Sequence, residues 1–192
     1  MNNFNINNVE QFNQNILLPT AFNNRNIISP VPIFFSNIYY NLIVYGNESW
    51  FCKTDHVTIS KDRVLVEDEH ITPKLKRRYS FLTDDAIKEL KTFPCILAYE
   101  NIKGGKTTLE HKAVIGQLRN VKILENEIEI YCNPFGESED KLFYIKQQRL
   151  NELSSQFGIV GHEGSNELGH THWTVKEVNL LETLRNNGMY YE

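Results

Sequence analysis

The chain has 192 residues, 41% of them apolar, and a formal net charge of −4 at pH 7. This length fits one domain or two small ones. The weakly acidic balance excludes a protein whose whole surface follows a phosphate backbone, because such domains are strongly basic. The three cysteines, Cys52, Cys95 and Cys132, form no Cys-x-x-Cys pair. A zinc knuckle and a dithiol redox pair are therefore excluded, and a reduced compartment is expected.

Neither an export signal nor a membrane span is indicated. Residues 1–8 have neither the basic nor the apolar region of a signal peptide. The longest apolar-rich window, residues 33–45, is interrupted by polar side chains and is too short to cross a bilayer. We therefore expect a cytoplasmic protein that does not associate with membranes.

The N-terminal part is rich in asparagine, with ten Asn among the first 26 residues. Asparagine favours turns over regular structure, so residues 1–30 are expected to form an arm. A β-rich segment is expected over 31–72, with a strand at 39–45 and a return strand from 50. A hairpin is expected between 56–59 and 64–66, where apolar and polar residues alternate.

Residues 68–79 are expected to be the boundary of a second unit, 79–192, although one continuous domain over 31–192 is the alternative. A helix should follow Thr83, because Thr is a good N-cap and two Asp residues suit the first turn. Strands are expected at 95–99, 113–115, 121–124, 128–131 and 172–176. Helices are expected over 142–157, ending at Gly158, and from Asn179.

These patterns predict the α+β class. The expected architecture is an antiparallel β-rich N-terminal part followed by a small bent β-sheet or partly open barrel, with two or three packed helices. Gly116, inside a run of strand-forming residues, predicts the bend, because short strands bent at glycine are how small sheets curve and barrels close.

The densest chemistry lies in residues 161–173, which hold half of the six histidines. Histidine and carboxylate side chains bind metals and move protons near neutral pH. On a strand, His170 and His172 would share one face, so both could hold one ion. Glu167 is the third ligand that we assign to this metal hypothesis, with His162 and Glu163 as alternatives.

The competing interpretation of this segment is an ordinary connection into a strand. The histidines would then simply be outward-facing polar residues. Lys176 shares their face and disfavours a nearby cation. On this interpretation, which we favour from the sequence, the rings of His170 and His172 diverge and no carboxylate shields Lys176. Trp173, on the other face, is expected to be a buried core residue together with Val175, Ile123 and Ile130.

A basic cluster, Lys74, Lys76, Arg77 and Arg78, is the candidate for nucleic-acid contacts. Acidic residues at 67–69 precede it, so a solvated segment that binds no nucleic acid tightly is the preferred interpretation.

Other motifs fail on spacing. Gly104-Gly105-Lys106 lacks the earlier glycine of a phosphate-binding loop, because that position is Glu100. There is no Gly-x-Ser-x-Gly elbow, and the acidic loop at 137–140 lacks the spacing of a calcium loop.

From the sequence, the leading functional hypothesis is a non-catalytic module without a cofactor. It would bind a protein partner or a small ligand near His162, His170, His172 and Trp173. The absence of catalytic signatures motivates this hypothesis. The alternative is a metal-dependent hydrolase or nuclease that uses the His-rich loop. Nucleic-acid binding through the basic cluster is a weaker alternative.

Overall fold

The computed structural model describes residues 35–46, 56–66, 70–101, 107, 111–136, 143–162 and 165–189, and for 162 and 165 the backbone alone. Several sequence predictions lie outside these residues. They are the arm at 1–30, the return strand from residue 50, the acidic residues at 67–69, the Gly104-Gly105 turn, the acidic loop at 137–140 and Glu163.

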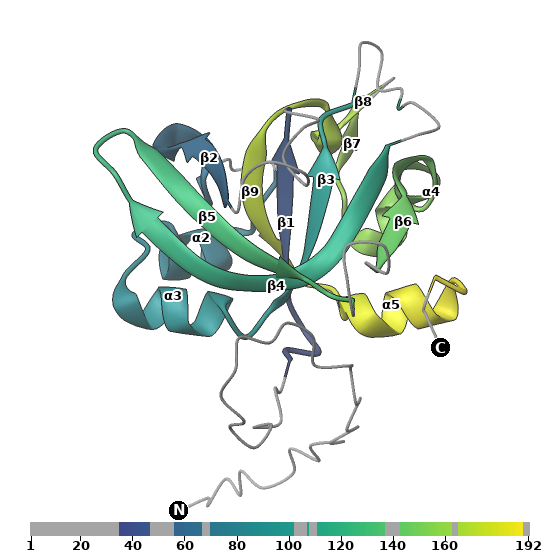
Figure 1. Ribbon diagram of the computed structural model, residues 1–192, viewed down its shortest axis with the longest axis horizontal. Helices are drawn as coiled ribbons and strands as arrows, with labels where there is room; N and C mark the ends of the chain where they lie inside the picture. Colours follow the sequence, from purple (N-terminus) through teal and green to yellow (C-terminus); the bar gives the residue numbers. More distant parts are fainter. Residues whose placement is uncertain are drawn as a thin grey trace, which may run out of the picture.

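The fold is α+β, as predicted, and is built on one open, strongly bent mixed sheet of seven strands (Figure 1). The sheet order is β2-β5-β4-β3-β1-β9, and β6 pairs with β4. Only β1 and β3 run parallel to each other. The strands are β1 (Tyr40–Tyr45), β2 (His56–Ser60), β3 (Pro94–Tyr99), β4 (Lys112–Ile123), β5 (Glu127–Pro134), β6 (Tyr144–Lys146) and β9 (His172–Lys176). A separate ribbon pairs β7 (Gly161–His162) with β8 (Ser165–Asn166).

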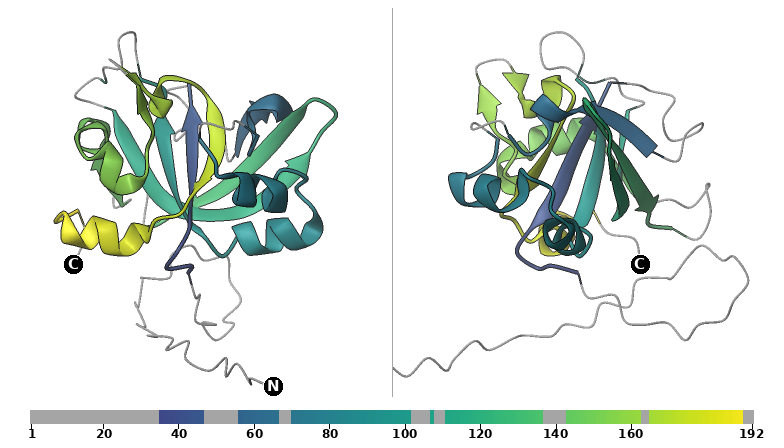
Figure 2. Two further views of the ribbon diagram at one scale, coloured as in Figure 1. Left: turned by 180° about the vertical axis from the view of Figure 1, so that it is seen from behind. Right: turned by 90° about the vertical axis from the view of Figure 1, so that its left-hand side faces the viewer.

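Helices cover both faces of the sheet. They are α2 (Pro73–Tyr79), α3 (Asp84–Leu90), α4 (Gln147–Glu152) and α5 (Leu180–Asn186), with short 3₁₀ turns η1 (Lys61–Arg63), η3 (Ser154–Phe157) and η4 (Glu167–Gly169). One apolar core lies under α2 and α3, and a second lies under α4 and α5. Strand β1 supplies both cores, because Ile43 points to the first and its neighbours Leu42 and Val44 to the second. Figure 2 shows the two helix pairs at opposite ends of the sheet.

Three predicted helix ends are confirmed. The side chain of Thr83 accepts a hydrogen bond from the Ala86 backbone N–H at the start of α3. The side chain of Asn179 accepts one from the Glu182 backbone N–H at the start of α5. Gly158 follows η3 with a φ of 65°, a left-handed conformation that glycine adopts without strain.

The predicted hairpin between 56–59 and 64–66 is wrong. Strand β2 pairs with β5 instead, in a register that puts Val57 opposite Ile130 and so buries apolar side chains of both strands together. Val64 bridges Trp173, and the Leu65 N–H donates to the Trp173 carbonyl. The chain after β2 therefore runs along the outer edge of β9.

Within the expected boundary at 68–79, residues 73–79 form α2. Its N-cap is Thr72, and Pro73 stands at the first helical position, where its missing N–H costs nothing. The sheet joins strands from both sides of this segment. The expected strands 113–115 and 121–124 are one bent strand, β4, and the helix expected over 142–157 divides into β6, α4 and η3.

Gly116 marks the close approach of β4 to β5. A Cβ there would lie 2.5 Å from the backbone oxygen of Asn133, so a larger side chain would force the strands apart. Among the described residues, no helix combines the length and the apolar character that crossing a bilayer needs.

Strand β9 has two chemically different faces. Trp173 and Val175 enter the core under α2 and α3 with Ile130, as predicted, whereas Ile123 is 48% exposed and does not belong to that layer. The Trp173 indole N–H donates to the Asn41 side chain at 3.1 Å. His172, Thr174 and Lys176 alternate with these core residues and are buried on the opposite face.

We predict that Trp173→Ala lowers the free energy of unfolding by about 3–5 kcal/mol, because it leaves a large cavity in the core. It also leaves the Asn41 side-chain oxygen without its indole donor. Chemical denaturation measures the loss. Ile123→Ala is the matched control, since Ile123 is half exposed on the same sheet. Equal, small losses for both variants would show that Trp173 does not anchor this core.

Candidate metal centre

Three histidines from distant parts of the chain meet over the polar face of β9. His70, His170 and His172 each offer a ring nitrogen, and these nitrogens lie within 4.8 Å of one another. The ring centroids are 4.8–5.0 Å apart. His70 and His172 are buried, and His170 is half-buried. We call these three residues the His cluster.

The turn η4 places a carboxylate beside the His cluster. Asn166 caps this turn by accepting a hydrogen bond from the Leu168 N–H. The backbone and side chain of Glu167 both bond to Val160, which fixes the turn to the chain after η3. The Glu167 carboxylate is fully buried, and its Oε2 lies 3.4 Å from His172 Nε2 and 4.0 Å from His70 Nδ1.

Lys176 fixes both Glu167 and His70 to β9. Its ammonium lies 2.6 Å from Glu167 Oε1 and donates to the His70 carbonyl at 2.9 Å. The Thr174 hydroxyl donates to the same carbonyl. Alternate residues of β9 therefore hold in place two segments that are almost 100 residues apart in the sequence.

The surroundings keep the Glu167 carboxylate ionised. Burial raises the pKa of Glu167, but the contact with His172 and the charge and hydrogen bond of Lys176 outweigh it, so the pKa is lowered overall. Burial lowers the pKa of Lys176, and the nearby Glu167 offsets part of that effect. A buried ion pair of this kind is costly to break, because removing one partner leaves the other charge without compensation.

The orientation of His172 is set by its backbone contact. Its Nδ1 lies 3.0 Å from the carbonyl oxygen of His170. A carbonyl only accepts hydrogen bonds, so Nδ1 carries a hydrogen, and Nε2 is the nitrogen that can bind a proton or a metal ion. Metal-binding histidines are oriented by this kind of second contact.

The lone pair of His172 faces another hydrogen-bond acceptor. Within the described parts of the chain, neither His172 Nε2 nor Glu167 Oε2 has a hydrogen-bond partner. When Nε2 carries no proton, the two atoms are buried acceptors 3.4 Å apart that repel each other, and either a proton or a metal ion between them removes the repulsion. Ligands about 2.0–2.2 Å from a tetrahedral zinc are themselves about 3.4 Å apart. The arrangement therefore has the spacing of two ligands of one ion.

The structure contradicts the expectation that the His rings diverge. The His170 and His172 rings stack at 4.8 Å, because both project from one face of an extended segment and His70 packs against them. The expectation that Lys176 lacks a carboxylate is also wrong, since η4 brings Glu167 onto the same face. The side chain of His162 lies outside the described residues.

His70 is the site residue that sequence reasoning missed. It lies in the segment that was expected to be a boundary between two units. Because a hundred residues separate it from His170, no short sequence motif contains both histidines. Trp173, a ligand-binding candidate from the sequence, faces the opposite side of β9 and is fully buried.

The basic cluster lies on α2. Lys74, Arg77 and Arg78 are exposed, as predicted, whereas Lys76 is half-buried. Arg78 forms a two-pronged ion pair with Glu89 of α3. This pair ties α2 to α3, so Arg78 has a structural role in the fold.

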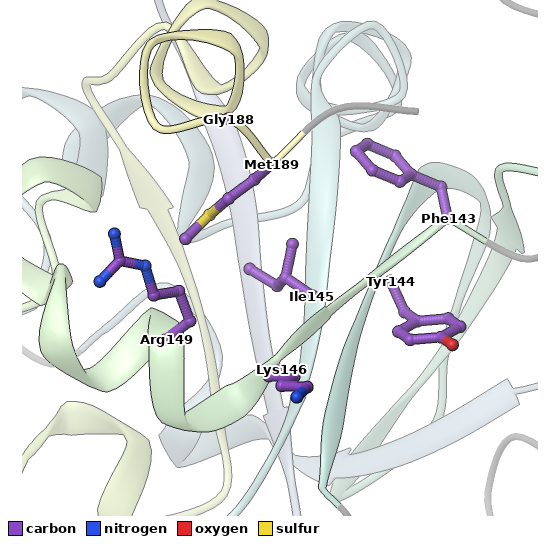
Figure 3. A pocket seen from close by; sticks show the side chains of 7 residues that line it. All are labelled: Phe143, Tyr144, Ile145, Lys146, Arg149, Gly188 and Met189. Atoms are coloured by element: carbon purple, nitrogen blue, oxygen red, sulfur yellow. The ribbon is translucent and has the colours of Figure 1, made fainter. Parts of the chain in front are cut away.

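A hollow of about 340 Å³ lies away from the His cluster, between β6, α4 and the end of α5 (Figure 3). Ile145 and Met189 border it with Arg149 of α4, and among the described residues its lining has neither an imidazole nor a carboxylate. The His cluster, which combines imidazoles with a carboxylate, is the stronger candidate site.

We predict that Lys176→Met lowers the free energy of unfolding by about 3–5 kcal/mol, because it leaves the Glu167 carboxylate buried without a cation. Adding Glu167→Gln should restore part of the loss by removing that charge. Lys122→Met is the control, since Lys122 pairs with Glu129 at the surface, and it should change stability little. If the buried and surface substitutions have the same small effect, the ion pair does not hold the site together.

Comparison with known proteins gives no relative from which to infer a function: no family model, curated protein or solved structure matches this chain.

Proposed function

We propose that this protein binds a divalent transition-metal ion through His70, His170 and His172, with Glu167 as the fourth ligand. The observation that carries this proposal is the buried contact between the lone pair of His172 Nε2 and Glu167 Oε2. An ion between these atoms turns a repulsive contact into two bonds.

A proton on His172 Nε2 is the simplest competing explanation, because an imidazolium could donate to Glu167. That explanation leaves the other two rings without a reason to gather. A metal ion accounts both for the contact with Glu167 and for the approach of three imidazoles to within 5.0 Å of one another. Neutral imidazoles are the state that binds metals.

The donor set indicates the class of ion. Imidazole and carboxylate suit zinc, iron, nickel and copper, whereas magnesium and calcium prefer sites made of oxygen ligands. Zinc is the simplest probe, because it has no redox chemistry and accepts tetrahedral nitrogen and oxygen ligands.

The metal site is preferred to the module that binds a partner or small ligand. That hypothesis came from the absence of catalytic signatures in the sequence, whereas the metal hypothesis gains a further ligand candidate in His70 and a carboxylate that pairs with Lys176. Metal binding does not exclude a partner, which stays a prediction. Nucleic-acid binding has less support, because Arg78 of the basic cluster is engaged with Glu89.

The proposal predicts that the metal-free protein binds one zinc ion and that His172→Gln weakens binding by more than the roughly 10–100-fold that loss of an outer contact costs. Glutamine is chosen because it removes the imidazole ligand while its amide N–H can donate to Glu167, so the buried carboxylate oxygen gains a partner. His56→Gln is the matched control, since His56 is half-buried on β2 and outside the His cluster. Isothermal titration calorimetry and elemental analysis measure affinity and stoichiometry.

Two results would contradict the proposal. One is the absence of stoichiometric zinc in the folded wild-type protein. The other is equal zinc affinity in the wild type and in folded His172→Gln, which would place the ion elsewhere. If His172→Gln does not fold, His170→Gln replaces it, because His170 is the least buried member of the His cluster and the most tolerant of substitution.

Zinc should also stabilise the fold. At a free zinc concentration 100 times the dissociation constant, linkage raises the free energy of unfolding by about 2.7 kcal/mol. For a protein of this size that corresponds to a rise in melting temperature of about 5–10 °C. Scanning calorimetry with and without EDTA measures the shift, and His172→Gln should lose it. An unchanged melting temperature at saturating zinc would show that no ion binds to the native site.

A further inference from the structure

We infer that the bound ion, held by its four proposed protein ligands, takes a fifth ligand from the solvent side: an anionic oxygen, either hydroxide derived from water or a carboxylate or phosphate oxygen of a small substrate. This inference rests on the metal site proposed above and gives it a chemical role. Three observations support it: the charge of the site, its exposure and the cleft beside it.

The charges of the proposed ligands, Lys176 and the bound ion sum to a positive value, which favours binding of an anion. Lys176 already compensates the Glu167 carboxylate through their 2.6 Å contact, and the three imidazoles are neutral as ligands. A dication therefore adds two positive charges that the four proposed ligands together with Lys176 do not offset. Closed structural zinc sites commonly neutralise their ion with cysteine thiolates, and none of the four ligands here is a cysteine. An oxyanion or hydroxide on the ion reduces the excess.

The exposure of the ligands is uneven. Glu167 and His172 are each 1% exposed, whereas His170 is only half-buried. The ion is thus enclosed from the side of β9 and η4 and approachable past the His170 ring. Catalytic zinc sites hold the ion through three protein ligands and a water or substrate, and they can expand to five ligands. Four protein ligands with a fifth ligand on the exposed side correspond to that expanded form.

A cleft of about 370 Å³ lies beside one of the proposed ligands, His70. Lys176 and Glu177 also line it, and its apolar walls include Val160 and Val178. This volume is within the range of small-molecule sites, and apolar walls around a few polar groups are their usual composition. The cleft gives a small substrate room next to His70 and Lys176.

The chemistry that follows is hydrolysis. A metal ion lowers the pKa of a bound water molecule to about 7, so hydroxide is available near neutral pH after the water releases its proton to solvent. With an ester, the hydroxide oxygen bonds to the acyl carbon, the bond from that carbon to the alcohol oxygen breaks, and the alcohol oxygen keeps the electron pair and takes a proton from water. The products are a carboxylic acid and an alcohol, and no oxidant or reductant is needed.

Cobalt(II) substitution tests the inference, because the visible spectrum of bound cobalt reports its coordination directly. The wild-type protein loaded with one equivalent of Co²⁺ should change its spectrum saturably when sodium acetate or inorganic phosphate is added at constant ionic strength. His56→Gln, loaded in the same way, should respond like the wild type. Free Co²⁺ in the same buffers controls for complexes formed in solution.

Hydrolysis of p-nitrophenyl acetate by the zinc-loaded protein distinguishes the two sources of the ligand. Turnover that EDTA abolishes and acetate inhibits indicates hydroxide as the fifth ligand. An acetate or phosphate response without turnover indicates a site for the oxyanion of a substrate. Either result supports a fifth ligand from the solvent side.

A cobalt spectrum that neither anion alters, together with no zinc-dependent turnover, would overturn the inference while the metal site itself stands, because the ion is then fully enclosed by protein ligands. Failure of the wild-type protein to bind either Co²⁺ or Zn²⁺ would remove the metal site and this inference together.

Discussion

The candidate site depends on one buried contact, the ion pair between Lys176 and Glu167. Lys176 belongs to a regular strand, whereas Glu167 belongs to a short turn that has little stability of its own. The 2.6 Å contact joins them, and the second hydrogen bond of the ammonium, to the His70 carbonyl, adds the segment that leads into α2. This lysine is the one side chain of β9 that contacts both the Glu167 carboxylate and the His70 carbonyl among the described residues, so it joins η4 and the segment before α2 to the strand that carries His172.

The position of β9 in the sheet explains how one strand serves both the core and the site. It is the last strand of the sheet order, paired with β1 on one side and bordered by Val64 and Leu65 on the other. Its odd-numbered residues are anchored in the core, where Trp173 donates to Asn41 and Asn41 donates to the Leu90 carbonyl. This anchoring fixes the strand rigidly, so the even-numbered residues present His172, Thr174 and Lys176 to the other face in a set geometry.

Local patterns predict this fold well where the stabilising interaction is local. The capping residues Thr83 and Asn179 and the left-handed Gly158 act on their own neighbours, so their effects can be read from the sequence. The pairing of β2 with β5 rather than with residues 64–66 is a choice between distant partners of similar apolar pattern, and tertiary packing decides it.

The residues of the candidate site likewise fall into those that local sequence patterns predict and those that only the folded chain brings together. The shared face of His170 and His172 follows from strand geometry, and Glu167 was identifiable as a nearby carboxylate. His70 was not identifiable from the sequence, because its contact with His170 and His172 depends on how the chain folds against β9. Lys176 was interpreted as a repulsive charge, since its pairing with Glu167 exists only after η4 folds over the strand. The sequence distance between His70 and the other site residues, rather than an unusual residue type, is the reason that sequence patterns did not predict His70 as a site residue.

The most direct test of the metal site is a crystal structure of the zinc-loaded protein with diffraction measured on both sides of the zinc absorption edge. The account predicts one anomalous peak about 2.0–2.2 Å from a nitrogen of each of His70, His170 and His172 and from Glu167 Oε2. A peak at some other place, or no peak and a direct hydrogen bond from His172 Nε2 to Glu167, would show that the cluster is a structural network of the apo protein.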